Sequence, residues 1–304
     1  MNNNLVLTRI FDAPRELVWD AWTKAEHIEK WWGPRGFDGT GSKVDLRVGG
    51  KWHFPMHHEH GVHWAMGFYK EITPIERLVF TDSFSDAEGN LKRASDYGMP
   101  AEWPSEILIT LELEDLGGRT KQTLTSHFDS PEQLALAKQM QMDLGWDESL
   151  DKMAEIFDER NLMMSRVVDA PQSLVWQAFS QPEHLIQWWG PEGFTNTFEK
   201  FEFREGGEWL FVMHGPDGTD WANIVTFTKI QPESLIAYDH GSPEAGTMFK
   251  AQIRMEAQGG KTKVTLCMSF ETKEARDQKI RDVGAIKGGM QTLGRLVEHV
   301  KNMA

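Results

Sequence analysis

The chain carries the same set of motifs twice. The phrase WWGPRGF at residues 31–37 returns as WWGPEGF at 188–194, and GGKWHFPMH at 49–57 returns as GGEWLFVMH at 206–214. Both pairs are separated by 157 residues. Because a solenoid would repeat a shorter unit three or more times, this single long repeat indicates two related domains in tandem.

The offset between the copies changes later in the chain, which locates an insertion. GGRTKQTLTSHF at 117–128 matches GGKTKVTLCMSF at 259–270, now only 142 residues apart. The first copy therefore contains about fifteen extra residues, placed within 83–103. This polar insertion could cover a cavity, contact the second domain or form a surface loop. We predict one domain at residues 1–158 and a second at 163–304.

Each copy begins with an extended segment followed by two short helices. In the first copy the tripeptide DAP at 12–14 predicts a helix start, with an acidic cap and a proline in the first turn. Thr23 and Glu26 have the spacing of a capping box for a second helix. Gly33 can adopt the left-handed conformation that ends a helix, and Pro34 blocks continuation. WWGP is therefore predicted to end a helix with an aromatic face, and the second copy keeps these signals.

Alternating hydrophobic residues then predict a series of strands. The alternation in GGKWHFPMH, and again over 107–113, has the period of two that a half-buried strand requires. Tight turns such as PDG at 216–218 join successive strands, which indicates an antiparallel meander. Trp103 of the insertion is predicted to open the strand that follows it. Both copies end in a long amphipathic helix, so the predicted fold class is α+β, with about six strands before that helix.

Aromatic and methionine side chains of these elements form the best candidate binding site. A helix laid across a curved sheet encloses a volume, and rings with thioethers suit an adaptable apolar pocket. The alternative is that these side chains fill the core and leave no cavity. The sequence does not decide the register of the fourth strand to within one residue. In the other register, Tyr69 points into the interior in place of Phe68. The residues predicted to face the interior are Trp31, Trp52, Phe54, Met56, Trp64, Phe68 and Trp146 in the first copy, and Trp188, Trp209, Phe211, Met213, Trp221 and Met290 in the second.

A histidine cluster lies in the first copy, within HFPMHHEHGVHW. A metal site would need three or four converging ligands with supporting hydrogen bonds. The second copy keeps only His214, and no HExxH motif or distant cysteine adds further ligands. We predict a solvated turn and no metal. The clustered residues are His53, His57, His58, His60 and His63.

Catalytic motifs are weak in this sequence. There is no GxSxG phrase, and no glycine-rich phosphate loop lies between a strand and a helix. Cys267 is predicted to fill a strand face. Asp239 and His240 follow each other after a strand and could form a base with its orienting partner, although adjacent pairs of this kind also arise by chance. We predict no catalytic residues and no cofactor.

The charge of the chain limits its partners. The formal net charge is −14, which repels nucleic-acid phosphates and anionic lipids. No apolar run approaches the roughly 20 residues of a membrane span, and no secretory signal is evident at the start. With Cys267 as the single cysteine, no internal disulfide can form. We predict a cytoplasmic protein that neither binds nucleic acid nor inserts into a membrane.

The motifs together resemble a known family. DAPxxxVW, WWGPxGF, GGxWxFxM and Gly145-Trp146 before the last helix are similar to the bacterial proteins related to the C-terminal domain of the activator of heat-shock-protein-90 ATPase. That resemblance implies the START-like helix-grip fold, also called SRPBCC, in which a seven-stranded antiparallel sheet holds a C-terminal helix around an apolar cavity. Two departures stand out. The second copy has Gly288-Gly289-Met290 in place of Gly145-Trp146, and nothing here corresponds to the separate N-terminal domain of the eukaryotic activator.

The resemblance fixes no chemistry, because helix-grip proteins include carriers, receptors and cyclases. The leading hypothesis is a non-enzymatic carrier or sensor of a small apolar or amphipathic molecule. The first alternative is a chaperone-accessory protein, as the family name suggests. The second is a cyclase-like or hydrolase-like enzyme, which a buried His, Arg or Tyr facing a polar-ended cavity would favour.

Overall fold

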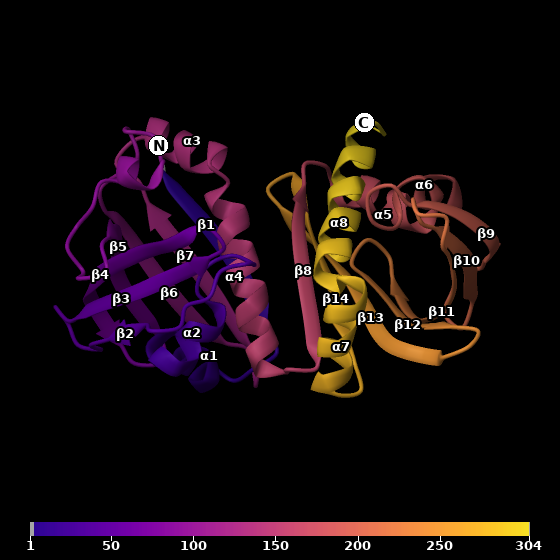
Figure 1. Ribbon diagram of the computed structural model, residues 1–304, viewed down its shortest axis with the longest axis horizontal. Helices are drawn as coiled ribbons and strands as arrows, with labels where there is room; N and C mark the ends of the chain where they lie inside the picture. Colours follow the sequence, from indigo (N-terminus) through magenta and orange to yellow (C-terminus); the bar gives the residue numbers. More distant parts are fainter. Residues whose placement is uncertain (1–2, 304) are drawn as a thin grey trace. The chain divides into compact units, whose positions relative to one another are not determined.

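The structure of the chain, a computed structural model, describes residues 3–303. Its internal contacts divide the chain into two compact units, Met1–Phe157 and Asp158–Ala304. Figure 1 shows the order of elements along the chain.

The first unit consists of strand, two helices, strands and two terminal helices. Its elements are β1 (Asn4–Phe11), α1 (Arg15–Thr23), α2 (Ala25–Trp31), β2 (Lys43–Val44), β3 (Lys51–His58), β4 (Gly61–Thr73), β5 (Arg77–Ser85), the 3₁₀ helix η1 (Ala94–Tyr97), β6 (Ile107–Asp115), β7 (Thr120–His127), α3 (Pro131–Gln139) and α4 (Met142–Phe157).

The second unit repeats this order without the 3₁₀ helix. Its elements are β8 (Asn161–Val168), α5 (Gln172–Ser180), α6 (Pro182–Trp188), β9 (Thr195–Phe201), β10 (Glu208–His214), β11 (Asp220–Gln231), β12 (Leu235–Ser242), β13 (Gly246–Gln258), β14 (Lys261–Ser269), α7 (Lys273–Val283) and α8 (Ala285–Lys301).

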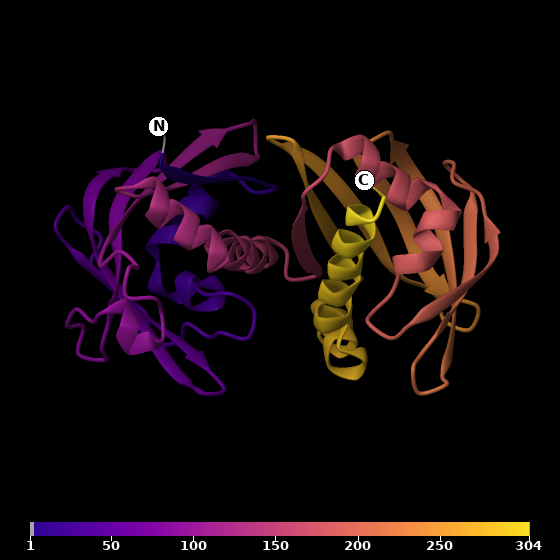
Figure 2. The same ribbon diagram turned by 90° about the horizontal axis from the view of Figure 1, so that it is seen from above.

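Each unit contains a seven-stranded sheet in which every neighbouring pair of strands is antiparallel. The strand order is β1-β7-β6-β5-β4-β3-β2 in the first sheet and β8-β14-β13-β12-β11-β10-β9 in the second. From β2 to β7 and from β9 to β14, strands that follow one another in sequence are neighbours in the sheet, and the first strand of each unit pairs with the last. In the first unit, the insertion with η1 separates β5 from β6. Figure 2 shows the first sheet curving around its helices. The predicted α+β class with two tandem helix-grip units is confirmed.

The short helices begin differently from the prediction. Pro14 and Pro171 are the N-cap residues of α1 and α5, with extended backbones, and they lie one position before the helix. The predicted capping box at Thr23 is wrong, because the Thr23 hydroxyl donates to the Trp19 carbonyl (2.8 Å) and Lys24 is the N-cap of α2. A threonine hydroxyl in the last turn of a helix easily donates to the backbone carbonyl four residues earlier in the same helix. It is then not available to cap the first turn of the next helix.

The long terminal helix predicted for each copy is present as α4 and α8, and a shorter helix, α3 or α7, precedes it. In the first unit the break between α3 and α4 contains Gln141, whose φ is 57°. In the second unit the same break between α7 and α8 contains Gly284, whose φ is 61°. Glycine adopts this left-handed conformation without strain, whereas glutamine does not. The shorter helices α3 and α7 ahead of these breaks were not predicted.

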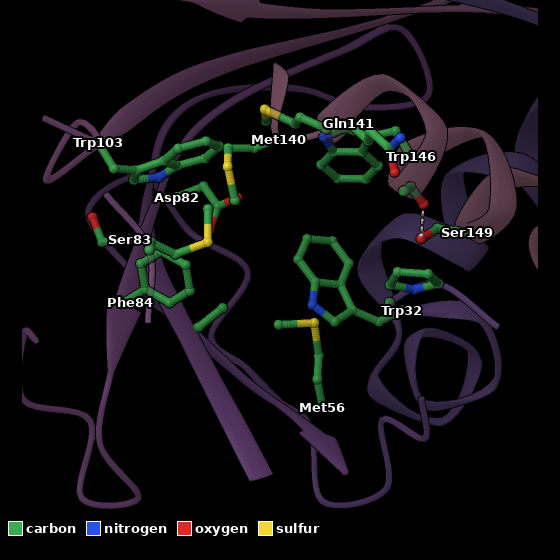
Figure 3. Close-up of a pocket in the computed structure, with 16 residues that line it drawn as sticks. Trp32, Met56, Asp82, Ser83, Phe84, Trp103, Met140, Gln141, Trp146 and Ser149 are labelled. Carbon is green, nitrogen blue, oxygen red and sulfur yellow. Dashed lines mark hydrogen bonds between the residues drawn. The ribbon is translucent and has the colours of Figure 1, made fainter. Parts of the chain in front are cut away.

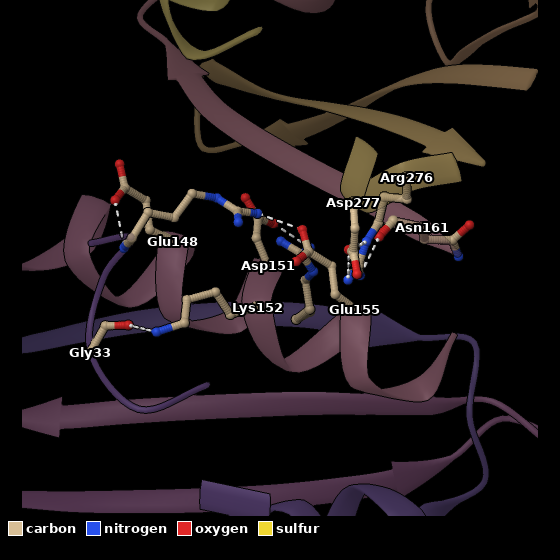
Figure 4. Close-up of polar contacts among 10 residues, drawn as sticks. Gly33, Glu148, Asp151, Lys152, Glu155, Asn161, Arg276 and Asp277 are labelled. Carbon is tan, nitrogen blue, oxygen red and sulfur yellow. Dashed lines mark hydrogen bonds and ion pairs between the residues drawn. The ribbon is translucent and has the colours of Figure 1, made fainter. Parts of the chain in front are cut away.

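The WWGP phrase ends a helix, as predicted, and is then held from the terminal helix. Gly33 and Gly190 follow α2 and α6 with φ values of 83° and 96°. The Lys152 ammonium group donates to the carbonyls of Gly33 (3.0 Å) and Phe37 (2.9 Å), as Figure 4 shows for Gly33. In the second unit Arg295 donates to the Gly190 carbonyl (2.9 Å). A cation from the last helix thus satisfies carbonyl groups that the helix end leaves free.

Candidate functional site

An open cavity of about 310 Å³ lies between the sheet and the terminal helices of the first unit. Its wall is built from the WWGP turn, from β3 to β5, from the break before α4 and from the first turns of α4. Figure 3 shows rings and thioethers surrounding the space. The side chains that matter most for its chemistry are Trp32, Met56, Asp82, Phe84, Trp103 and Trp146.

Indole rings dominate this first cavity. The Trp32 ring lies edge-on to the Trp146 ring, with centroids 5.4 Å apart and planes at 90°. Trp103 reaches the cavity from the loop before β6, together with Met99. The prediction that Trp103 opens a strand is therefore wrong, since β6 begins at Ile107. The insertion contributes wall residues to the cavity.

Asp82 is the ionisable side chain of the first cavity. It lies on β5, where alternation places it on the same face as Phe80 and Phe84. Within residues 3–303, no Lys, Arg or His lines this cavity beside Asp82, and no group donates a hydrogen bond to its carboxylate. Burial raises the pKa of Asp82 to about 7. A carboxyl group is thus held in apolar surroundings without a counter-charge.

The raised pKa of Asp82 predicts a pH dependence of stability. Between about pH 4 and pH 7 the folded state keeps a proton that the unfolded chain releases, so this group lowers stability as pH rises through that window. We expect Asp82→Asn to remove the loss and to exceed the wild type by up to about 4 kcal/mol in unfolding free energy at pH 8, but by little at pH 4. Urea denaturation at the two pH values measures this; a difference independent of pH would contradict it.

A second cavity of about 340 Å³ occupies the same position in the second unit. Its wall also combines the WWGP turn, the central strands, the helix break and the start of α8. The lining includes Trp189, Met213, Trp221, His240 and Phe249. The two units therefore share the cavity as well as the fold.

One extra residue in a hairpin of the second unit shifts the correspondence between the copies. Met56 lies opposite His63 across β3 and β4, whereas Met213 lies opposite Trp221 across β10 and β11. The offset of 157 residues therefore becomes 158 after the hairpin. Phe80, which pairs with Tyr69, then corresponds to Tyr238, which pairs with Phe227.

This shift places His240 at the position of Asp82. The His240 ring stacks on Phe249, with centroids 4.5 Å apart and planes at 13°. Its Nδ1 atom is buried without a hydrogen-bond partner. Burial, helped by the charge of Lys279, lowers the pKa of His240 to about 4. Each cavity thus carries a half-buried titratable group at the same point of its wall, an acid in one and an imidazole in the other.

Asp239 and His240 do not form the acid–base pair considered from the sequence. They are neighbours within β12, so their side chains point to opposite faces of the sheet. His240 shares its face with the buried Tyr238, while Asp239 lies opposite Lys250 on the other face. Cys267 lies half-buried on β14, where its Sγ atom is 4.0 Å from the Ser269 hydroxyl.

The predicted site residues divide into three groups. The first contains those that line the two cavities, namely Met56, Trp146, Met213 and Trp221. The second contains those that are buried in the cores and do not line them, namely Trp31, Trp52, Phe54, Trp188, Trp209 and Phe211.

The third group was placed wrongly by one residue. Phe54 and Met56 of β3 point inward and pair with Ala65 and His63 of β4. The inward side chains of β4 are therefore the odd-numbered ones. Trp64 and Phe68 lie on the opposite face of the sheet. Trp64 stacks there on His53, with centroids 4.6 Å apart. The other register considered for this strand, with Tyr69 inward, is the correct one.

Met290 was also displaced by one residue. Ser149 and Thr292 both donate to the carbonyl four residues earlier, Gly145 and Gly288 respectively (2.8 Å each), which aligns the two helices. The counterpart of Trp146 is therefore Gly289. A Cβ atom at Gly289 would lie 2.5 Å from the Met164 side chain, so Met164 fills this space in the second unit.

The second tryptophan of each WWGP phrase was missed as a cavity residue. Trp31 and Trp188 are fully buried, and their indole N–H groups donate to the carbonyls of Ala21 (2.9 Å) and Ala178 (3.0 Å). The neighbouring rings, Trp32 and Trp189, line the cavities instead. Adjacent side chains at a helix end point in different directions. The two consecutive tryptophans of the motif did not indicate which ring faces the cavity.

The clustered histidines lie along β3, its hairpin and β4. His53 contacts the Asp86 carbonyl (3.0 Å), and His57 contacts the Thr40 carbonyl (3.0 Å). The rings of His58 and His63 lie 4.6 Å apart. Within residues 3–303, no three His, Cys, Asp or Glu side chains converge in a way that could hold a metal ion. In the same part of the chain, no helix has both the length and the apolar character needed to cross a bilayer.

The chain is similar to several solved structures. The chain is similar to a solution structure from Arthrobacter aurescens, with 26% identity, a TM-score of 0.45, and coverage of 48% of this chain and 88% of the other. A crystal structure from Chromobacterium violaceum is 28% identical over 51% of this chain and 97% of the other, with a TM-score of 0.39. DynU16, a protein in the dynemicin biosynthetic locus, is 14% identical over 99% of this chain and 100% of its own, with a TM-score of 0.38.

No curated protein sequence is significantly similar to the chain. The family model described as Activator of Hsp90 ATPase homolog 1-like protein matches twice, at residues 12–158 and 169–301. These two matches together cover most of the sequence and fall on the two helix-grip units. The chain therefore belongs to the Activator of Hsp90 ATPase homolog 1-like family and carries two tandem copies of its domain.

Proposed function

We propose that the chain is a non-enzymatic carrier or sensor that binds a small apolar or amphipathic molecule in the cavity of each unit. The observation that carries this proposal is the recurrence of an open cavity, of about 310 Å³ and 340 Å³, at the same place in both units. Volumes of this size lie at the lower end of the roughly 300–1,000 Å³ range of small-molecule sites. A ligand of about two fused rings is the expected size class.

The chemistry of the walls supports an apolar ligand body. Rings from the WWGP turn and thioethers from the central strands line both cavities, with Trp32 and Met56 in the first and Trp189 and Met213 in the second. Thioethers adapt to irregular shapes, and rings offer large contact areas with few rotatable bonds. Transfer of apolar ligand surface into such a site is favourable by about 25 cal/mol per Å².

The hydroxyl groups at the helix side of each cavity favour binding over catalysis. Ser149 and Thr292 donate their protons to carbonyls within their own helices. A nucleophilic hydroxyl instead needs a base positioned to take its proton. His240 faces the second cavity, but it stacks flat on Phe249 and its burial disfavours the protonated form.

Binding is tested with a neutral two-ring probe, naphthalen-2-ylmethanol. We expect two molecules per full-length chain in native mass spectrometry, with a Kd on the order of 10–100 μM by tryptophan fluorescence. Ala65→Leu fills part of the first cavity, since Ala65 lines its wall, and should reduce the stoichiometry to one. Ala222→Leu is the matched control, because Ala222 is exposed on β11, and should keep both sites.

Absence of saturable binding by the wild type would contradict the proposal. So would binding that Ala65→Leu leaves at two molecules per chain. The family description suggests a second role, stimulation of an Hsp90-type ATPase. Stimulation of a purified chaperone ATPase by a protein that binds no probe would favour that interaction role instead.

A further inference from the structure

We propose that the first cavity is a site for a hydrophobic amine, in which Asp82 binds the ammonium group and the surrounding rings hold the apolar body. This inference rests on the proposed function and specifies the ligand class of one of its two sites. The second cavity, which has His240 at the corresponding position, is not selective for amines.

The carboxylate of Asp82 is placed where a ligand would meet it. Figure 3 shows Asp82 among the rings and thioethers that line the cavity, with Trp103 on one side and Trp32 and Trp146 across the space. Asp82 is half-buried, so its carboxyl group remains reachable from the open cavity. Its neighbours on the same face of β5 are rings, and the carboxylate is the charged group among the residues that line the cavity.

The carboxylate also lacks a partner within the protein. No side chain or backbone group of residues 3–303 donates a hydrogen bond to Asp82, and no charged group faces it from the strands, the insertion or the helices around the cavity. An ionised carboxylate in such surroundings is destabilised unless a counter-charge is supplied. A ligand ammonium group supplies that charge together with N–H donors, and it makes a charge-assisted hydrogen bond.

The rings of the cavity strengthen the preference for a cation. Aromatic faces attract an ammonium group through their quadrupoles, and tryptophan does so best. Trp32, Trp103, Trp146 and Phe84 surround the space into which Asp82 points. A carboxylate combined with several rings recognises an amine by charge and by ring contact, whereas an anionic ligand would be repelled by Asp82 and by the ring faces.

The second unit provides a comparison within the same chain. Its wall carries His240 in place of Asp82, and its two charged lining residues, Lys279 and the exposed Asp282, have opposite signs, so their formal charges sum to zero. An imidazole that burial keeps neutral offers no charge to an ammonium group. The two sites should therefore take a neutral ligand alike and differ in their response to an amine.

The experiment compares naphthalen-2-ylmethanamine with naphthalen-2-ylmethanol, which share the same ring system, by calorimetric titration of the full-length chain. At pH 8 we expect one site per chain to bind the amine about tenfold more tightly than the alcohol. Since burial raises the pKa of Asp82 to about 7, amine affinity should fall about tenfold between pH 8 and pH 6, while affinity for the alcohol stays constant.

Two variants separate the Asp82 carboxylate from general charge effects. Asp82→Asn should remove the tenfold preference for the amine and leave binding of the alcohol unchanged. Asp115→Asn makes the same charge change at an exposed turn and should leave both affinities unchanged. Melting temperatures establish that each variant is folded.

The outcomes distinguish this inference from the function on which it rests. If the wild type binds the amine no more tightly than the alcohol, or if Asp82→Asn keeps the preference, the amine site is wrong while binding of the alcohol still supports a ligand cavity. If neither probe binds, the proposed function fails together with the inference.

Discussion

Replacing Trp31 with alanine is expected to lower the unfolding free energy of the first unit by about 3–5 kcal/mol. The Trp31 side chain is completely buried in the core, and its ring packs against Trp22 with centroids 4.7 Å apart. The substitution opens a large cavity and removes the indole donor from the Ala21 carbonyl. Urea denaturation of the full-length chain, followed by far-ultraviolet circular dichroism, measures the change.

The matched control is Trp221→Ala. The Trp221 side chain is 47% exposed, so the same chemical change should cost less than about 1 kcal/mol there. Equal losses for Trp31→Ala and Trp221→Ala would mean that the first ring of the WWGP phrase is not part of the core.

Replacing Lys152 with methionine is expected to destabilise the first unit by about 2 kcal/mol. Two charge-assisted hydrogen bonds, to the carbonyls of Gly33 and Phe37, are lost and the carbonyls are left without these donors. The loss is smaller than the sum of two such bonds, because the cation is itself costly to bury: burial and the nearby Arg35 charge lower the pKa of Lys152 to about 8. Denaturation by urea at pH 7 measures the difference.

A conservative variant separates the hydrogen bonds from simple packing. In the second unit Arg295 donates a hydrogen bond to the carbonyl of Gly190, the counterpart of Gly33. Lys152→Arg should therefore retain most of the stability that Lys152→Met loses. If arginine and methionine at position 152 are equally destabilising, the carbonyl contacts do not hold the WWGP turn.

The fold was predictable because its signals are periodic and appear twice. Alternation along β3 and β6, helical spacing along α4 and α8, and turn residues between strands all indicate one antiparallel meander. The family resemblance then implied the helix-grip arrangement, which the structure and the family match confirm. The helix breaks at Gln141 and Gly284, and the shorter helices before them, were not predicted from the sequence.

The site was predicted less well, and the errors are local. Trp64 and Phe68 were assigned to the wrong face of β4 because the register of this strand was open by one residue, and the β3–β4 hairpin places its odd-numbered residues inward. In the second unit, a single additional residue in the hairpin before β11 means that Trp221 does not correspond to Trp64. The same residue concealed the correspondence between Asp82 and His240. Comparing the two hairpins by length, rather than by a fixed offset, would have revealed both.

The tryptophan pair of the opening motif has two separate roles. Trp31 and Trp188 secure the helix end to the core, whereas Trp32 and Trp189 form part of the cavity walls. Sequence alone gives no direction to adjacent rings at the end of a helix, because the backbone leaves the helical conformation at the second one. The motif is thus structural and cavity-forming at once.

Both units contain the cavity, but several of the residues that line it differ between them. Gly289 replaces Trp146, and the Met164 side chain occupies the space beside it. His240 replaces Asp82 at the centre of the wall. Such changes leave the packing of sheet and helix intact while altering the shape and charge that a ligand would meet.

The most direct test of ligand binding in both cavities is a crystal structure of the full-length chain with 2-bromonaphthalene. Two bromine anomalous peaks per chain are expected, one between Trp32 and Trp146 and one beside Trp189 and Phe249. Bromine peaks confined to the protein surface, with both cavities free of the probe, would contradict the proposed binding function.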